Sequence, residues 1–353
     1  MRQRHRFFEY GFEPLLFLII VIALIVPVFK IQALTVSPIR IELEGNPGET
    51  VKGELTLSNE SDGFQTFYTV SQNFEARGES GAPNFVTGTE GLATWITAPE
   101  NLDLKPNEYR ERIPFEIKIP MEAEPGGHFA AIFWTTNPPS DIESGVAIGV
   151  KVGTLILLRV SGDIEEGGGI IEFSTIDKQK IYLHRPINFF YRFRNDGADR
   201  IKPDGTANIR NLLGIRSDSL PPNSIEGNIL PDSIRLFEFT WEGRGLSQKE
   251  PTNWFSVFWL NVNNEWHNFG IGRYSVKLSL DYGADKQLHS EAKYVFWILP
   301  WHLSLVAIII LIILYFVGRR EILSYNEWIV RRTIKHMNQL KEAARRYGGK
   351  KKV

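Results

Sequence analysis

The side chains that most often carry catalytic or metal chemistry are spread thinly along this sequence. It has seven histidines and no cysteine, so thiolate metal ligands and cysteine nucleophiles are excluded. The histidines are His5, His128, His184, His267, His289, His302 and His336. No two of them have the spacing of a zinc-binding helix, and no Gly-x-Ser-x-Gly turn for a serine nucleophile occurs. His128 follows Gly126 and Gly127 and is best interpreted as a half-exposed strand residue.

Acidic residues offer few further candidates for chemistry. Asp141 and Glu143 follow Pro138 and Pro139 in a loop, but the alternating Asp run of a calcium loop is missing there. Two carboxylates of a glycoside hydrolase can meet from any two strands, and no pair stands out in this sequence. We therefore expect no catalytic site, no cofactor and no bound metal.

Aromatic residues are the more informative group. They cluster in one short segment as Trp254, Phe255, Phe258, Trp259, Trp266 and Phe269. Exposed rings stack on sugar faces, so Trp254, Trp259 and Trp266 are the candidate ligand-binding residues, with a glycan as the ligand. A second interpretation is that these rings pack in a core and contact lipid headgroups.

An apolar run at residues 296–317 organises the rest of the chain. It contains no Asp, Glu, Lys or Arg, and at about 1.5 Å per residue it can cross the ~30 Å hydrocarbon core of a bilayer. Aromatic residues lie at both of its ends, where rings favour the membrane interface. The run predicts a single transmembrane helix at 296–317.

Basic residues follow the apolar run. Lys and Arg dominate residues 318–353, although the whole chain carries a net charge of only −1. The positive-inside rule therefore predicts a cytoplasmic tail and an extracytoplasmic remainder. Apolar and basic residues fall on different sides of a helical wheel, which favours a basic amphipathic helix on anionic lipids. The membrane-surface residues are Arg319, Arg320, Arg331, Arg332, Lys335, Arg345 and Arg346. Nucleic acid attracts the same charges, but lipid is the expected partner and no nucleic acid is expected.

The N-terminus predicts export of the chain. Arg2, Arg4 and Arg6 precede an apolar run at 15–29, and Ala33 offers a small residue for cleavage. This pattern is typical of a signal peptide at residues 1–33, or of an uncleaved signal anchor. An exported chain without cysteine favours a prokaryotic cell surface.

Between the two apolar ends the sequence predicts β-structure. Residues 34–163 alternate apolar and polar side chains in short runs separated by Gly, Pro and Asn turns, which indicates an immunoglobulin-like β-sandwich. An acidic, glycine-rich linker is expected at 164–169, and a second immunoglobulin-like or fibronectin-like sandwich at 170–295. The predicted class is all-β: two tandem sandwiches, then the transmembrane helix and the basic amphipathic helix.

Several motifs of the first predicted domain resemble one family. They are Val-Ser-Pro-Ile-Arg at 36–40, Asn-Pro-Gly-Glu-Thr at 46–50, Leu-Ser-Asn-Glu-Ser at 57–61, Phe-Glu-Ile-Lys-Ile-Pro at 115–120 and Pro-Gly-Gly-His-Phe-Ala-Ala-Ile at 125–132. Together they resemble the immunoglobulin-like domain of WxL-interacting surface proteins. The resemblance implies peptidoglycan binding by this domain, followed by a second sandwich, a membrane helix and a basic tail.

The sequence therefore predicts a single-pass surface protein that binds and does not catalyse. Its ectodomain is expected to bind peptidoglycan or another cell-surface protein. A second hypothesis is a scaffold or chaperone-like subunit of a surface or secretion assembly, which pairs an exposed edge strand with a strand of its partner. A surface hydrolase would require a carboxylate pair in a cleft.

Overall fold

The computed structural model describes residues 34–86, 88–138, 151–243 and 253–348. The predicted signal segment at 1–33 and the acidic loop with Asp141 and Glu143 lie outside the described residues. The chain divides into two compact units. Unit 1 contains residues up to Glu166 together with Asp196–Arg200 and Leu230–Ser233, and unit 2 contains the remainder.

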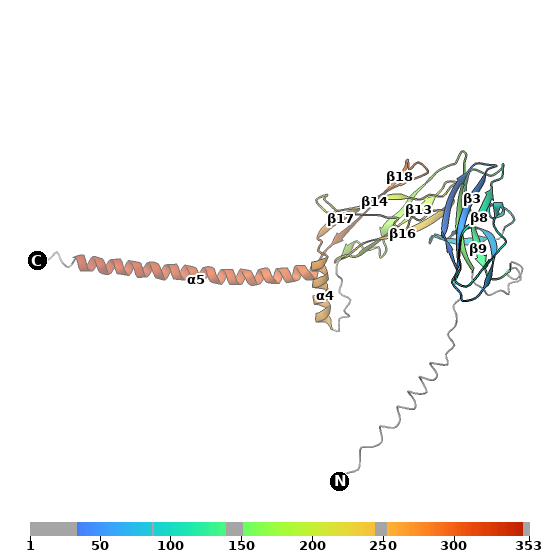
Figure 1. Ribbon diagram of the computed structural model, residues 1–353. Helices are drawn as coiled ribbons and strands as arrows, with labels where there is room; N and C mark the ends of the chain where they lie inside the picture. Colours follow the sequence, from blue (N-terminus) through green and yellow to red (C-terminus); the bar gives the residue numbers. More distant parts are fainter. Residues whose placement is uncertain (1–33, 87, 139–150, 244–252, 349–353) are drawn as a thin grey trace, which may run out of the picture. The chain divides into compact units, whose positions relative to one another are not determined.

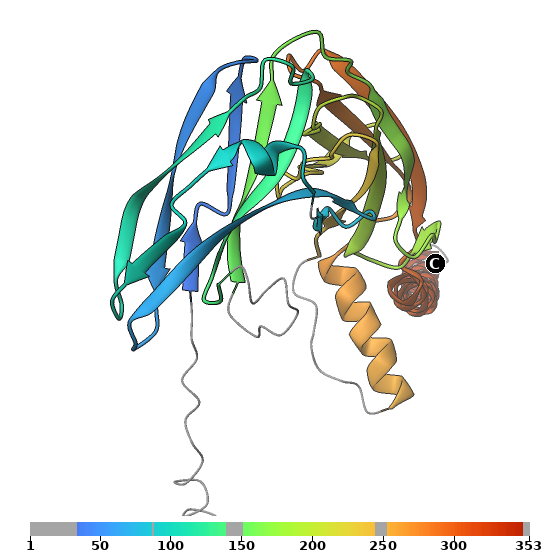
Figure 2. The same cartoon turned by 90° about the vertical axis from the view of Figure 1, so that its right-hand side faces the viewer.

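Unit 1 is built from two sheets and a short helix (Figures 1 and 2). The first sheet has the order β1 (Leu34–Ser37), β3 (Thr50–Asn59), β8 (Tyr109–Lys118) and β6 (Ile96–Thr97). The second has the order β2 (Arg40–Gly45), β10 (Lys151–Val160), β9 (Gly126–Thr135), β4 (Gln65–Arg77) and β5 (Ala82–Val86), and β7 (Asn101–Leu104) also pairs with β4. The helix is α2 (Leu92–Trp95). The chain passes from the first sheet to the second between β1 and β2, and β2 then runs parallel to β10.

Alternating side chains build the core of unit 1. Ile113, Phe115 and Ile117 of β8 are buried, as their period-two spacing predicts. Trp134 of β9 is the largest fully buried side chain and packs in the same cluster. These residues confirm a β-sandwich whose two inner faces share one core.

Asn59 shows what the Leu-Ser-Asn-Glu-Ser motif does structurally. Its buried side-chain amide donates to the carbonyl oxygens of Gly63 and Lys105 at 2.9 and 3.0 Å. Its Oδ1 atom accepts from the backbone N and the hydroxyl of Ser61 at 3.1 and 2.7 Å. Asn59 thus ties the end of β3 to the turn before β8, and it satisfies backbone groups that would otherwise be buried without partners.

Unit 2 also contains two sheets. One has the order β11 (Gly168–Thr175), β13 (Ile187–Asn195) and β16 (Ser233–Trp241). The other has the order β12 (Ile181–Tyr182), β18 (Leu288–Ile298), β17 (Gly272–Tyr282), β14 (Asp204–Arg210) and β15 (Arg216–Leu220). The predicted linker is shorter than expected, because Gly168 and Gly169 already pair with β13. The hydroxyl of Tyr282 donates to the carbonyl of Gly168 at 2.5 Å.

Aromatic rings fill the core of unit 2. Phe189 is completely buried and lies 5.4 Å from Phe239 and 5.8 Å from Phe296, measured between ring centroids. The rings of Tyr191 and Phe237 stack at 4.9 Å. Ile187, Phe189, Tyr191 and Phe193 alternate with other residues in the sequence, and they form the inward face of β13.

The predicted start of the membrane helix is wrong. Phe296 and Ile298 are core residues of β18, and Leu299 and Pro300 alone separate this strand from helix α5 (Trp301–Gly348). An apolar strand end and an apolar helix give one continuous apolar run, so composition does not show where one becomes the other. Among the described residues, α5 is the one helix long and apolar enough to cross a membrane.

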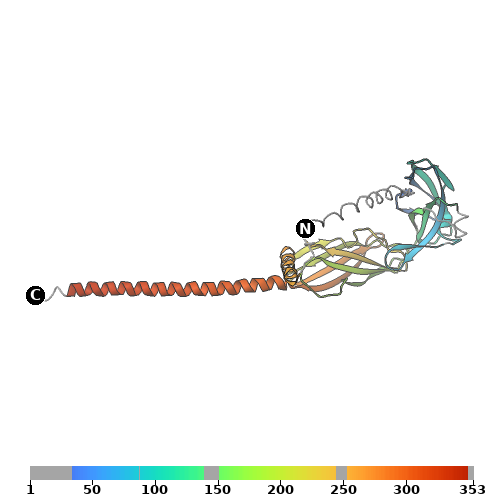
Figure 3. The ribbon, with the colours of Figure 1, turned by 90° about the horizontal axis from the view of Figure 1, so that it is seen from below.

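Two further expectations about helices need correction. Residues 254–267 were expected within an all-β domain, but they form helix α4 (Trp254–His267). A separate amphipathic helix was expected after residue 317, but α5 continues through Gly318 as a single helix of 48 residues. Figures 1 and 3 show α5 as one uninterrupted helix.

Candidate functional site at the start of the long helix

Helix α4 begins at a capping box. The side chain of Asn253 accepts from the backbone N of Ser256 at 2.8 Å, and the Ser256 hydroxyl accepts from the backbone N of Asn253 at 3.1 Å. These two bonds satisfy N–H groups that a helix start leaves without partners. The capping pair fixes the first turn of a segment whose composition alone does not distinguish a helix from a strand.

Exposure differs between residues of α4: Val257 is exposed, whereas Val262, on the same side as Phe255 and Trp266, is buried. Phe255, Trp259 and Trp266 lie along one side at helical spacing and are exposed. Asn264, Glu265 and Asn268 lie on the other side and are buried. Glu265 is the one acidic residue of α4, which contains no Lys or Arg, so the exposed side of the helix carries no carboxylate, ammonium or guanidinium group.

Glu265 joins α4 to the first turn of α5. Its side chain is 0% exposed, and its Oε1 atom lies 2.6 Å from Nδ1 of His302. Its Oε2 atom accepts from the backbone N of Leu303 at 2.7 Å. A carboxylate at a helix N-terminus satisfies a free N–H group and is attracted by the positive end of the helix dipole.

His302 completes this buried connection. Its Nε2 atom lies 3.3 Å from the Asn261 amide nitrogen, which can only donate. Nε2 therefore accepts, and Nδ1 donates to Glu265. We call Glu265, His302 and the Leu303 backbone N–H the helix junction.

Aromatic contacts extend the connection from α4 to α5. The ring of Phe258 lies 5.4 Å from His302 and 6.4 Å from Trp301, and Trp301 stacks on His302 at 3.7 Å. Trp301 is half exposed. We use the name aromatic collar for the exposed rings of α4 together with the first residue of α5, namely Trp254, Phe255, Trp259, Trp266 and Trp301.

All three predicted ligand-binding tryptophans belong to the aromatic collar. Trp254, Trp259 and Trp266 are 79%, 47% and 68% exposed, so they do not pack in the core. Phe255 lies between the first two, at 5.9 Å from Trp254 and 6.2 Å from Trp259. Sequence reasoning did not identify Glu265 and His302, because their pairing depends on the contact between two helices.

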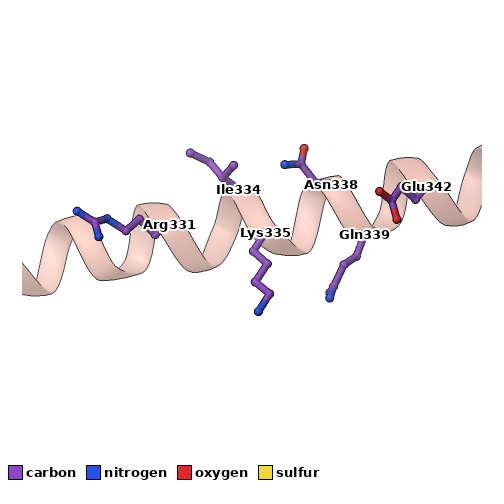
Figure 4. Close-up of a pocket in the computed structure, with 6 residues that line it drawn as sticks. All are labelled: Arg331, Ile334, Lys335, Asn338, Gln339 and Glu342. Atoms are coloured by element: carbon purple, nitrogen blue, oxygen red, sulfur yellow. The ribbon is translucent and has the colours of Figure 1, made fainter.

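The predicted membrane-surface residues lie on α5. Arg319, Arg320, Arg331, Arg332 and Lys335 are exposed, and residues 345 and 346 belong to the same helix. Figure 4 shows the side chains of Arg331, Lys335 and Glu342 fanning out from one helix together with three neighbours. A hollow lined by successive turns of a single helix does not enclose a ligand, so we assign no site there.

A second aromatic cluster lies on unit 1, on the face of the second sheet opposite the core, and its Phe74 and Phe133 rings are buried. Phe85 is 39% exposed, and its ring lies 4.8 Å from Phe133 and 6.1 Å from Phe74. Phe129 lies 5.9 Å from Phe74. The amine of Lys151 lies 3.9 Å from the centre of the Phe133 ring and donates to the side-chain carbonyl of Gln72 at 2.8 Å. We call these residues the unit 1 aromatic face.

Two ion pairs of unit 2 lie at the surface. Lys286 donates to Asp204 at 2.7 Å and lowers the pKa of that carboxyl. Lys277 and Glu291 pair at 2.7 Å across β17 and β18, which lowers the pKa of Glu291. Within the described ranges, no group of three or more His, Asp or Glu residues could hold a metal ion.

Comparison with known proteins gives no family assignment. No protein-family model matches the chain, and no curated protein matches it. Similar solved structures include the class 5 fimbriae chaperone CfaA, with 11% identity and a TM-score of 0.34 over 76% of this chain and 100% of that one. The E. coli chaperone DraB shows 12% identity and a TM-score of 0.30 over 75% and 97% of the two chains.

A PapD-like domain of human CEP192 is also similar. It shows 14% identity and a TM-score of 0.25 over 36% of this chain and 84% of that one. Similarities of this strength carry no argument about the function of the present chain. The resemblance to WxL-interacting surface proteins therefore stays a prediction from the motifs of unit 1.

Proposed function

We propose that the chain is a membrane-anchored cell-surface binding protein without a catalytic site. The observation that carries this proposal is the direct passage from β18 into α5 across Leu299 and Pro300. The last strand of a folded unit thus continues into a helix long and apolar enough to cross a bilayer. Unit 2 is thereby held close to the membrane without a flexible stalk.

The distribution of charge supports the direction of crossing. Arg319 and Arg320 directly follow the apolar part of α5, and Lys and Arg remain frequent to the end of the chain. The positive-inside rule assigns this end to the cytoplasm and both units to the other side. The predicted signal peptide or signal anchor at residues 1–33 agrees with the same topology.

The unit 1 aromatic face is the surface we propose for ligand binding. It combines an exposed ring at Phe85 with the amine of Lys151 and the amide of Gln72. Rings that stack on sugars and polar groups that bind hydroxyls are the usual components of a glycan-binding surface. Peptidoglycan is therefore the first candidate ligand, and another cell-surface protein is the second.

Sedimentation with insoluble peptidoglycan tests this assignment. The purified full chain in detergent should be enriched in the pellet, and Phe85→Ser should reduce the enrichment. Phe64→Ser is the matched control, because Phe64 is an exposed phenylalanine of unit 1 outside this face. No enrichment over an unrelated β-sandwich would remove the peptidoglycan candidate, and a protein partner lost in Phe85→Ser would favour the second one.

A second candidate function is strand addition in a surface assembly, and β16 is the observation that favours it. This strand has nine residues, lies at the end of its sheet, and contains no Pro or Gly. The other edge of this sheet, β11, has eight residues but begins with two glycines and has a register shift after Ile170. Of the edges of other sheets, β15 has five residues and β5 contains Pro83. A long regular edge offers unpaired backbone groups to an extended strand of a partner.

Proline replacement at two edges separates strand addition from other modes of binding. A stoichiometric partner that co-purifies with the full chain in detergent should be lost in Glu238→Pro, on β16. Ser217→Pro, on β15, should leave that complex intact. Circular dichroism must show that both variants keep their β-structure, and retention of the partner by folded Glu238→Pro would exclude addition at β16.

A further inference from the structure

We propose that α4 is a second membrane contact that lies in the lipid headgroup region beside unit 2, with the aromatic collar as its lipid-binding surface. This inference rests on the proposed crossing of the membrane by α5. The new element is that the exposed rings of α4 contact lipid. The sequence alone allowed either a glycan or lipid headgroups as the partner of these rings.

The helix junction fixes where α4 lies. Glu265 holds His302 at 2.6 Å and the backbone N of Leu303 at 2.7 Å, so α4 is attached to the first turn of α5. In a membrane-crossing helix that begins at Trp301, this turn enters the bilayer. The depth of α4 is therefore set by residues of the crossing helix itself.

The direction of α4 suits a helix in the membrane interface. Figure 1 shows α4 lying across the start of α5, and Figure 2, which looks along α5, shows α4 from its side. If α5 follows the membrane normal, α4 lies nearly in the membrane plane. Its 14 residues then extend about 21 Å along the surface.

The chemistry of the exposed side fits lipid. Phe255, Trp259 and Trp266 place apolar rings outward, and tryptophan favours the depth at which its ring is in lipid and its N–H reaches water. Burial of apolar surface in the interface drives such binding. The helix junction keeps the one carboxylate of α4 away from lipid.

A glycan is a poorer fit to the same surface. Sugar sites place charged or amide groups beside the stacking rings to bind hydroxyls. No charged group lies on the exposed side of α4, and Asn263 is the one exposed amide of the helix. The unit 1 aromatic face has both a charged group, Lys151, and an amide, Gln72, beside its rings. The two aromatic surfaces thus have different partners, lipid at the collar and the proposed ligand on unit 1.

Single-cysteine labelling tests the proposal directly, because the native chain has no cysteine. The full chain would carry Trp259→Cys or Trp266→Cys, labelled with an environment-sensitive fluorophore, in nanodiscs of phosphatidylcholine. Controls are Glu54→Cys on unit 1, Asn263→Cys on the polar flank of α4, and Ile310→Cys within the apolar part of α5. Iodide reports exposure to water, and spin-labelled lipids report depth.

The collar probes should be quenched by iodide about threefold less than the Glu54 probe, as expected for a side chain at interfacial depth. A lipid spin-labelled near the headgroup should quench them more strongly than a lipid labelled deep in the acyl chain. The Ile310 probe should show the opposite preference, and the Asn263 probe should be quenched by iodide more than the collar probes and less than the Glu54 probe.

Each remaining outcome is decisive. In one outcome, iodide quenches the collar probes as strongly as the Glu54 probe while the Ile310 probe stays shielded. This result would overturn the lipid contact of α4 and leave the membrane anchor in place. An Ile310 probe open to iodide would overturn the anchor and the proposed function with it. Shielding of the collar that begins only after addition of soluble cell-wall fragments would make the collar a glycan site and exclude lipid as its partner.

Discussion

At the residue scale, a single carboxylate connects two helices. Glu265 is fully buried, and both of its oxygens have a partner at the first turn of α5. Removal of one partner from such a buried connection leaves the other polar groups without hydrogen bonds, at a cost of about 1–3 kcal/mol or more. The junction should therefore be sensitive to small changes at this one position.

We predict that Glu265→Ala loosens α4 from α5. Protection of the α4 amides against hydrogen exchange should fall by at least about tenfold, the equivalent of ~1.4 kcal/mol of local opening. Exchange would be measured by mass spectrometry on the full chain in nanodiscs. His267→Ala changes an exposed residue of the same helix and should have little effect; equal losses in both variants would contradict the assigned role of Glu265.

Surface ion pairs predict a pH dependence of a different kind. The pKa of Asp204 is lowered chiefly by its hydrogen bond to Lys286. A carboxyl with a lower pKa in the folded chain stabilises the fold above its unfolded pKa, and this contribution is lost as the pH falls through the folded pKa. The pKa of Lys286 is raised by the same pair, so the contribution persists across neutral pH.

Lys286→Met should therefore make the turn between β17 and β18 open more readily at pH 7, but not at a pH well below the pKa of Asp204. The effect should be small because both side chains are exposed. Hydrogen exchange of this turn at the two pH values measures it, after correction for intrinsic rates. If Lys286→Met raises the exchange rate of this turn equally at both pH values, the lost packing of the lysine methylenes is responsible and the lost charge is not.

At the element scale, period-two patterns were reliable where one side of a strand is buried. Ile113, Phe115 and Ile117 lie in the core of unit 1, and Phe189 and Tyr191 lie in that of unit 2, as their alternation predicts. The pattern failed at 254–267 and at 296–300. There apolar residues occur in short consecutive runs, such as 257–260 and 296–299, so periodicity gives no sign of the change from strand to helix.

The candidate site could be predicted only in part. The tryptophans of α4 were identified from their clustering, but their position on a helix depends on the capping pair of Asn253 and Ser256. The link between Glu265 and His302 joins residues far apart in the sequence. Only the packing of α4 against α5 brings them together, and no local pattern indicates it.

The core of unit 2 gives a prediction for β13. Phe189→Ala should destabilise unit 2 by about 3–5 kcal/mol, because it removes a completely buried ring that contacts Phe239 and Phe296. Hydrogen exchange of the β13 and β16 amides in the full chain would measure the loss. Leu213→Ala, at an exposed position of unit 2, should change it by less than about 0.5 kcal/mol.

At the scale of the whole molecule, the proposal makes a prediction of topology. A cysteine introduced as Glu54→Cys should react with a membrane-impermeant maleimide on intact cells, whereas Ser324→Cys on the basic part of α5 should react only after the cells are opened. The native chain contains no cysteine, so the background is low. Labelling of Ser324→Cys on intact cells would reverse the proposed orientation.

The way the chain enters and leaves unit 2 has a mechanical consequence. The first segment of unit 2 begins at Gly167, next to Gly168, which is bonded to Tyr282 at one end of β17. The last segment leaves β18 at Ile298, which pairs with Gly272 at the other end of β17. A pull at Gly168, resisted by α5 in the membrane, would therefore act along β18. The hydrogen bonds between β17 and β18 would share this load in shear and would not open one after another, which is the stronger geometry for a tether under tension.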